Sequence, residues 1–115
     1  MMDFQGKIAL VTGASSGMGA ETARLLSDGG ARVFGAQRGL SDFEDIAVDF
    51  ADPSSPVKAI DHIAKATGQL DILVNNAGVM REGTVEETSL DDWHLQMQIN
   101  LTAPFLLIRY AMPLL

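Results

Sequence analysis

The chain has 115 residues, of which 47% are hydrophobic and 20% charged, a composition that is typical of one globular domain and excludes general disorder. Its net charge of −7 has the wrong sign for a protein that binds nucleic acid or anionic lipid, so we expect neither partner. The sequence has no cysteine, which excludes disulfides and thiolate metal sites. Neither a signal peptide nor an apolar run long enough to span a membrane is recognised, so we expect a cytoplasmic protein with one domain over residues 1–115.

Short apolar runs alternate with helical patterns along the chain, which predicts a parallel β-sheet covered by helices. The first run, residues 8–11, is continuous and suits a strand buried on both faces. A glycine-rich turn over residues 13–19 follows and leads into a helix that ends at Gly29-Gly30. We expect the apolar face of this helix to carry Met18, Leu25 and Leu26.

Two more short strands are predicted over residues 32–36 and 46–48, although Gly35 weakens the first of them. Only residues 37–45 separate the two strands. A helical crossover usually needs a dozen or more residues, so we expect a loop or a single helical turn here.

The second helix is predicted to begin with Asp52 as its N-cap and Pro53 as its first helical residue, and to end at Thr67-Gly68. The apolar run over residues 70–74 is the fourth predicted strand. This strand would lie at an open edge of the sheet, although its sequence is mostly of the kind found in buried strands.

A polar loop over residues 75–88 leads to the last helix, for which Ser89 is the predicted N-cap. Pro104 must kink or locally open this helix, because proline lacks a backbone N–H. The expected apolar face carries Trp93, Met97, Leu101 and Ile108, with Trp93 as a packing anchor.

The turn over residues 12–19 joins the first strand to the first helix. Glycines in such a turn allow positive φ angles and close approach of a ligand. The helix behind it offers unpaired N–H groups and a partial positive charge, both of which favour a pyrophosphate. A tight strand-to-helix turn without a ligand explains the glycines as well; the strand–turn–helix context favours dinucleotide binding.

Dinucleotide-binding folds often place a specificity residue about 20 positions beyond these glycines, at the end of the second strand. Gln37 and Arg38 stand there. An acid would bind a ribose 2′-hydroxyl, whereas neutral Gln37 tolerates a 2′-phosphate and Arg38 can pair with one. NADP(H) is therefore favoured over NAD(H), unless Arg38 is only a solvated loop residue.

The sequence Asn75-Asn76-Ala77-Gly78 follows the fourth strand, and the glycines at 13, 17 and 19 have the spacing Gly-x-x-x-Gly-x-Gly. With Asp49 after the third strand and Asn100 in the last helix, this pattern resembles the short-chain dehydrogenase/reductase (SDR) family over essentially the whole chain. The resemblance implies a Rossmann-like, doubly wound parallel sheet with strand order 3-2-1-4, of which this chain would hold the N-terminal half.

The resemblance also implies site residues. Asn100 matches the active-site asparagine that holds a water in the family's proton relay. Met18 replaces a commoner isoleucine, a change that nearly conserves volume. The residues expected to bind the cofactor are Gly13, Ser15, Ser16, Gly17, Met18, Gly19, Arg38, Asp49, Phe50, Asn76, Ala77 and Gly78.

Within the family, residues 3–7, the short connection after the second strand and residues 91–93 are similar to 2,3-dihydro-2,3-dihydroxybenzoate dehydrogenases. Those enzymes have an acid at the position of Gln37 and use NAD. This difference leaves the substrate open.

Family members transfer a hydride between nicotinamide and an alcohol or ketone carbon, using a serine and a Tyr-x-x-x-Lys pair for proton transfer. The only tyrosine here is Tyr110, and Leu114 stands where the lysine would be. No serine follows Ser89. We therefore expect Tyr110 to be an ordinary helix residue and the isolated chain to be inactive. His62 and His94 are far apart in sequence, so no metal site is predicted.

The expected function is thus the cofactor-binding half of an oxidoreductase acting on a small alcohol or ketone. A missing C-terminal half, on the same gene product or another chain, would complete the sheet. The apolar segment over residues 103–115 suits a helix packed between the sheet and another subunit, so a homo-oligomer is also expected. Two alternatives stay open: a dinucleotide-binding module without chemistry, and a truncated fragment without a function of its own.

Overall fold

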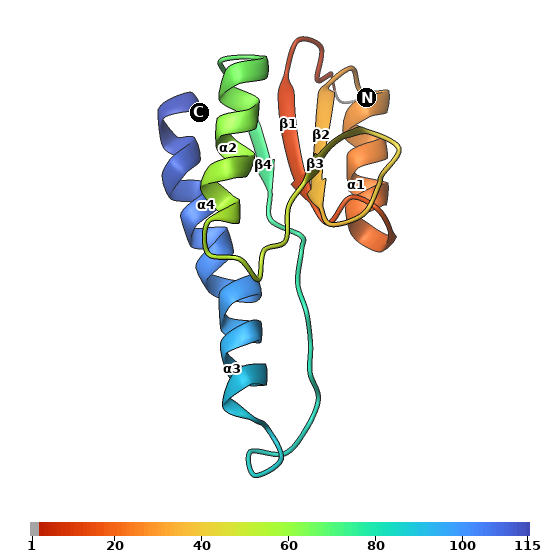
Figure 1. Cartoon of the computed structure of the whole chain (residues 1–115). Helices are drawn as coiled ribbons and strands as arrows, with labels where there is room; N and C mark the ends of the chain where they lie inside the picture. The colour runs from red at the N-terminus through yellow and green to blue at the C-terminus, as the bar shows by residue number, and fades with distance from the viewer. Residues whose placement is uncertain (1–2) are drawn as a thin grey trace.

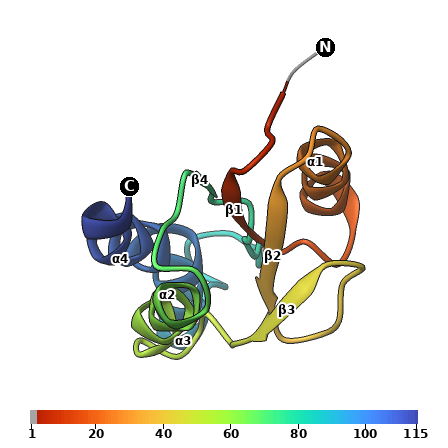
Figure 2. The ribbon, with the colours of Figure 1, turned by 90° about the horizontal axis from the view of Figure 1, so that it is seen from above.

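The computed structural model describes residues 3–115 and has a four-stranded parallel sheet between two layers of helices (Figure 1, Figure 2). The sheet order is β3-β2-β1-β4. This order confirms the predicted Rossmann-like, doubly wound arrangement. The strands are β1 (Ile8–Thr12), β2 (Arg32–Gln37), β3 (Glu44–Ala47) and β4 (Ile72–Val74).

Helix α1 (Gly17–Asp28) covers one face of the sheet, and α2 (Ser55–Ala66) and α4 (Ala103–Ala111) lie side by side on the other (Figure 2). Helix α3 (Leu90–Met97) continues through a π-helical turn (Gln98–Thr102) into α4, and a 3-10 turn (Met112–Leu114) follows. Figure 1 shows that α3 and the loop before it extend well beyond the end of the sheet. Over residues 3–115, no helix combines the length and apolar character that a membrane crossing requires.

Alternate residues of β1 belong to two separate apolar clusters, as expected for a strand buried on both faces. Ala9 and Val11 pack with Ala23 and Leu26 of α1. Leu10 belongs to the cluster on the opposite face, with residues of α2 and α4. The continuous apolar run that predicted this strand therefore fills both cores.

The connection between β2 and β3 is a loop over residues 38–43, as the short spacing predicts. The first residue of β3, Glu44, pairs with Phe34 in the middle of β2. The loop therefore runs back from the end of β2 only as far as the middle of that strand. Strand β3 begins two residues earlier than predicted. The side chain of Glu44 forms an ion pair with Arg32 of β2 (Nε–Oε2 2.6 Å), which ties the start of β3 to its neighbour.

Strand β4 is shorter than predicted, because Leu70 and Asp71 precede it. The Asp71 N–H donates to the carbonyl of Ile8 (2.8 Å), and its carboxylate accepts from the Ile8 N–H (2.7 Å). The Ile8 N–H is the main cause that lowers the pKa of Asp71 below its ordinary value. The Asp71 carboxylate thus accepts from the Ile8 N–H, a backbone donor that a longer pairing of β1 with β4 would use.

The predicted start of the second helix is wrong by two residues. Ser54 is the N-cap of α2, and Pro56 rather than Pro53 lies in its first turn. The carboxylate of Asp52 accepts from the N–H and the hydroxyl of Ser54 (both 2.9 Å), which makes a turn ahead of the helix. Asp52 therefore orders the approach to α2 without capping it.

The predicted apolar faces of the first and last helices are also wrong. Leu26 of α1 is buried as expected, but Met18 is 80% exposed and Leu25 52% exposed. On α4 the buried residues are Ala103, Leu107 and Ala111. The side chains of Trp93 on α3, Leu101 in the π-helical turn and Ile108 on α4 are about half exposed. The wider π-helical turn ahead of Pro104 shifts the phase of the apolar stripe, and it is the local opening that Pro104 predicts. The N-cap at Ser89 is confirmed by its bond from the Asp92 N–H (3.0 Å).

Truncating Leu107 to alanine tests the packing of α4 on α2. The side chain is 1% exposed, so we expect Leu107→Ala to lower the free energy of unfolding by about 2–5 kcal/mol. Phe105→Ala, at a position 58% exposed, is the control and should cost less than about 1 kcal/mol. Urea unfolding followed by circular dichroism measures both; equal losses would contradict this packing.

Candidate functional site

The turn between β1 and α1 depends on two glycines with positive φ, Gly13 (φ 69°) and Gly17 (φ 59°). A Cβ added to Gly13 would lie 3.1 Å from the side-chain nitrogen of Asn76, so this glycine also permits close packing. A Cβ added to Gly17 would meet nothing within 4 Å. Gly17 is thus required for its backbone angle, at a place where the turn faces open space.

Gly19 has a different role in the first turn of α1. A Cβ at this position would collide with the carbonyl oxygen of Gly13 and with the side-chain nitrogen of Asn76. Only glycine lets α1 approach the turn and the loop after β4 this closely. Asn76 also donates from its side chain to the Gly13 carbonyl (3.2 Å), so the two glycine-containing motifs are in contact.

The N-terminus of α1 is open to a ligand. Ser16 is the N-cap with an extended backbone, and within residues 3–115 its hydroxyl makes no capping hydrogen bond. The N–H groups of a first helical turn have no intrahelical partner, and the helix dipole favours an anion beside them. The exposed residues around this end are Ser15, Ser16, Gly17 and Met18.

Thr12, the last residue of β1, joins the turn to the loop after β4. Its hydroxyl accepts hydrogen bonds from the backbone N–H groups of Asn76 (3.0 Å) and Ala77 (2.9 Å). The side chain is only 2% exposed. These two bonds satisfy the buried hydroxyl and two half-buried N–H groups together, and they hold the first residues after β4 against the end of β1.

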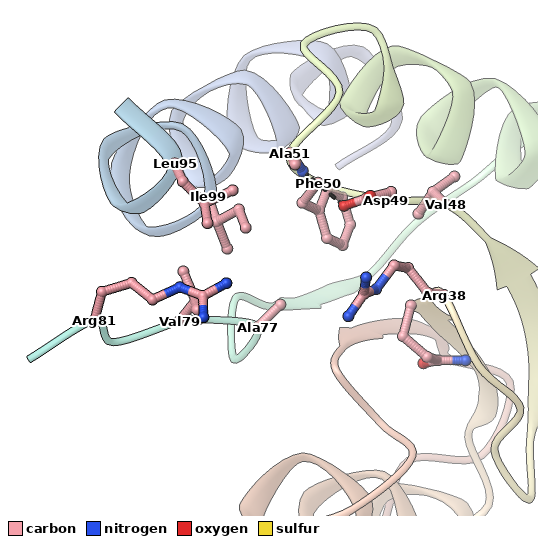
Figure 3. A pocket seen from close by; sticks show the side chains of 12 residues that line it. Arg38, Val48, Asp49, Phe50, Ala51, Ala77, Val79, Arg81, Leu95 and Ile99 are labelled. Carbon is pink, nitrogen blue, oxygen red and sulfur yellow. Dashed lines mark hydrogen bonds between the residues drawn. The ribbon is translucent and has the colours of Figure 1, made fainter. Parts of the chain in front are cut away.

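A pocket of about 290 Å³ opens beside this junction (Figure 3). Its walls come from the segments that follow β2, β3 and β4, together with α3 and the π-helical turn. Figure 3 shows the guanidinium groups of Arg38 and Arg81 pointing toward each other across the opening. The lining residues are Gln37, Arg38, Val48, Asp49, Phe50, Ala51, Ala77, Gly78, Val79, Arg81, Leu95 and Ile99.

The pocket and the glycine-rich turn lie at the carboxyl ends of the parallel strands. The chain passes from β1 to β2 and β3 on one side of the sheet and returns to β4 on the other, so β1 and β4 flank the switch point. Ligands of open α/β sheets bind in the crevice at this point.

The side chain of Gln37 is held by hydrogen bonds within the protein. Its side-chain oxygen accepts from the Ala14 N–H (3.2 Å), and its side-chain nitrogen donates to the Gly39 carbonyl (3.1 Å) and to Asp45 (2.9 Å). Arg38, the next residue, is exposed and lines the pocket. The hydrogen bond from the Ser41 hydroxyl is the main cause that lowers the pKa of Asp45 below its ordinary value; burial opposes it, and the bonds from the Ser41 N–H and from Gln37 lower the pKa further by smaller amounts.

Asn100 lies in the π-helical turn and is hydrogen-bonded to the loop after β4. Its side-chain oxygen accepts from the Val79 N–H (2.8 Å), and its side-chain nitrogen donates to the Val79 carbonyl (2.6 Å). The structure thus gives this side chain a bracing role beside Gly78. π-helical turns occur frequently at functional sites.

The residues predicted from sequence fall into three groups. The turn residues gather at the N-terminus of α1, where Gly13 and Gly19 lie against Asn76. Arg38, Asp49, Phe50, Ala77 and Gly78 line the pocket, and Asn100 lies next to Gly78. Sequence reasoning missed Thr12, Ser41 and Asp45. A threonine at the end of a buried apolar strand is a signal, because its hydroxyl must find a partner; nothing in the sequence singles out the other two.

A family model described as short chain dehydrogenase matches residues 7–115. The chain belongs to this family. The D-threitol dehydrogenase of Mycolicibacterium smegmatis is 41% identical to it, and the 3-oxoacyl-(acyl-carrier-protein) reductase of Salmonella typhimurium is 35% identical. These alignments cover 91% and 96% of this chain but 46% and 50% of the relatives, so the chain spans about half the length of the curated relatives it matches.

A solved short chain dehydrogenase from Burkholderia cenocepacia, in complex with NADP, is similar to this chain with a TM-score of 0.90 and 35% identity. The match covers 97% of this chain and 52% of that one. This family member of known structure thus shares the fold described here, and the Burkholderia protein holds NADP in its structure.

Thr12→Val tests the junction between the two motifs. Valine matches the shape of threonine but leaves the N–H groups of Asn76 and Ala77 without their partner, so we expect a loss of about 2–4 kcal/mol in the free energy of unfolding. Thr12→Ser keeps the hydroxyl and serves as the control, with a loss of about 1 kcal/mol. Chemical denaturation measures both, and a valine variant as stable as the serine variant would show that the hydroxyl bonds are dispensable.

Proposed function

We propose that this chain is an NAD(P)-binding domain over residues 1–115, and that it prefers NADP(H). The observation that carries the proposal is the junction of two motifs at the switch point: an open helix N-terminus with Gly17 at positive φ, next to a pocket lined by Arg38 and Asp49. Among residues 3–115, nothing packs where a Cβ of Gly17 would lie and the Ser16 hydroxyl caps no N–H, so both fit a ligand that binds here.

The cofactor would be held by groups of different chemistry. The pyrophosphate and adenosine ribose would meet Gly13, Ser15, Ser16, Gly17, Met18 and Gly19 at the positive end of α1. The adenine would enter the pocket, where Asp49 can accept from its amino group beside Phe50, while Ala77 and Gly78 form the opposite wall. Asn76 would support the turn from behind.

Arg38 supports the preference for NADP(H). Its guanidinium is exposed and directed into the pocket, where it can pair with a 2′-phosphate (Figure 3). Gln37 is uncharged, so no acid at the end of β2 repels that phosphate. The cofactor supplies hydride when bound, and the chain's part is to bind and orient it.

In the assembled enzyme, the substrate would be a small alcohol or ketone. The chain has one tyrosine, Tyr110, which lies on α4 and has Leu114 where the family has its lysine. Asn100 matches the active-site asparagine of the family. We propose that it helps to form the site, and that it does not transfer a proton without the missing groups. In this proposal, a catalytic half supplies the remaining groups.

The partner that we propose is the missing C-terminal half, on the same gene product or on another chain, or else a second copy of this chain in a homo-oligomer. Two surfaces support this. Strand β4 is an edge of the sheet, and its residues are only half-buried. The π-helical turn exposes Leu101, and the outer side of α4 exposes Phe105 and Ile108; these apolar side chains favour a covering protein surface.

A second candidate is a dinucleotide-binding module without chemistry. The observation that favours it is the sequence around Tyr110, which has no lysine four positions later. Both candidates require cofactor binding, so they differ only in whether a catalytic partner exists.

Arg38→Asp tests the cofactor preference. Loss of a charge-assisted hydrogen bond predicts that the Kd for NADPH rises about tenfold or more, while the Kd for NADH changes less. Arg109→Asp makes the same charge change at an exposed position of α4 and is the control. Fluorescence titration measures the Kd for both dinucleotides in the parent chain and in the two variants. Equal changes for NADPH and NADH, or none, would show that Arg38 does not read the 2′-phosphate.

The 115-residue chain is expected to bind NADPH but not to oxidise it in the presence of small ketones. The reason is the absence of a tyrosine–lysine pair to deliver the proton. Ultraviolet absorbance of the reduced nicotinamide is followed, with a full-length family member as positive control. Substrate-dependent oxidation that stays with the purified chain through repeated preparations would refute this expectation.

A further inference from the structure

Three polar residues form a cluster behind the pocket, at the boundary of β2 and β3. One carboxylate oxygen of Asp45 accepts from the side-chain nitrogen of Gln37 (2.9 Å), the N–H of Ser41 (3.0 Å) and the hydroxyl of Ser41 (2.6 Å). At its other end, Gln37 accepts from the Ala14 N–H (3.2 Å). The Gln37 side chain thus spans from the glycine-rich turn to β3.

The partners of Gln37 allow its amide only one orientation. The Ala14 N–H can only donate, and the carboxylate of Asp45 can only accept, so the amide oxygen faces the turn and the nitrogen faces Asp45. An amide nitrogen has two hydrogens, and the Gly39 carbonyl takes the other one (3.1 Å). Both donors of Gln37 are therefore used within the protein, although the residue lines the pocket.

Gly35 in the middle of β2 makes room for this cluster. A Cβ there would lie 3.0 Å from the Ala14 Cβ and from the Ser41 hydroxyl, and 3.1 Å from the Gln37 side-chain oxygen. These contacts are tight enough that the cluster would have to shift. A glycine that weakens the strand is thus explained by the side chains packed over it.

Resting on the cofactor binding proposed above, we infer that Asp45 is a positioning residue that sets the preference between a ribose 2′-phosphate and a 2′-hydroxyl. It holds the Gln37 amide against the glycine-rich turn. Arg38 is then the side chain that can contact the 2′ position of the ribose in the pocket. Without the Asp45 carboxylate, one Gln37 N–H loses its acceptor, and the amide can rotate into the pocket. There a neutral amide can bond a 2′-hydroxyl, which favours NAD(H) relative to NADP(H).

Asp45→Ala tests this role through the ratio Kd(NADH)/Kd(NADPH), measured by fluorescence titration of the 115-residue chain. We expect the ratio to fall about fivefold, the size of one hydrogen bond, mainly through tighter NADH binding. Asp45→Asn can still accept through its amide oxygen and should keep the ratio within about twofold. Ser41→Ala removes other bonds to the same carboxylate and should also leave the ratio in place.

A double-mutant cycle separates positioning from general damage. If Asp45 acts through Gln37, Asp45→Ala should leave the ratio unchanged in a Gln37→Ala background. A ratio that falls equally in both backgrounds overturns the inference, as does an unchanged ratio in Asp45→Ala alone. Asp45→Val, which suits a strand position, replaces the alanine variant if circular dichroism shows that the latter is unfolded.

The same titrations distinguish this inference from the proposal on which it rests. If the parent chain binds neither dinucleotide, the proposed function fails and the role of Asp45 fails with it. If the parent chain binds dinucleotide and the ratio does not respond to Asp45→Ala, only the role of Asp45 is overturned.

Discussion

The hydroxyl of Thr12 is the contact on which the site depends. It accepts from two backbone N–H groups in the loop after β4, while Asn76 of that loop donates back to the Gly13 carbonyl. These bonds hold the loop after β1 and the loop after β4 together at the switch point of the sheet. Gly19 completes the arrangement, because any larger residue would separate α1 from both loops. The open N-terminus of α1 then lies directly beside the pocket.

The two ends of the pocket differ in how their side chains are held. At the β2 end, hydrogen bonds to Ala14 and Asp45 hold Gln37 in place, while Arg38 is exposed. At the β4 end, Asn100 of the π-helical turn is hydrogen-bonded to the backbone N–H and carbonyl of Val79. An exposed, charged arginine beside side chains that are held by hydrogen bonds is an arrangement suited to choosing between ligands that differ by one phosphate.

Much of the fold is predictable from sequence, because strands buried on both faces appear as continuous apolar runs and glycine spacing marks the first turn. The errors have local causes. Asp52 makes a turn ahead of α2, so the cap moves to Ser54. Helix α3 extends beyond the sheet and leaves Trp93 exposed, and the π-helical turn after it changes the phase of the last helix. The placement of the motifs around one crevice was predictable, but the bonds of Asp45 depend on a loop path that no local pattern encodes.

The most direct test of the account is to map where a dinucleotide binds on the chain by following its backbone amides with NMR. On addition of NADPH, we predict that the largest shifts occur in the turn from Gly13 to Gly19, at Arg38, at Asp49-Phe50 and at Ala77-Gly78. Amides on the outer side of α4 should stay unchanged. Saturable shifts confined to other surfaces, or none at NADPH concentrations that saturate a full-length family member, would contradict the claim that these residues form a cofactor site.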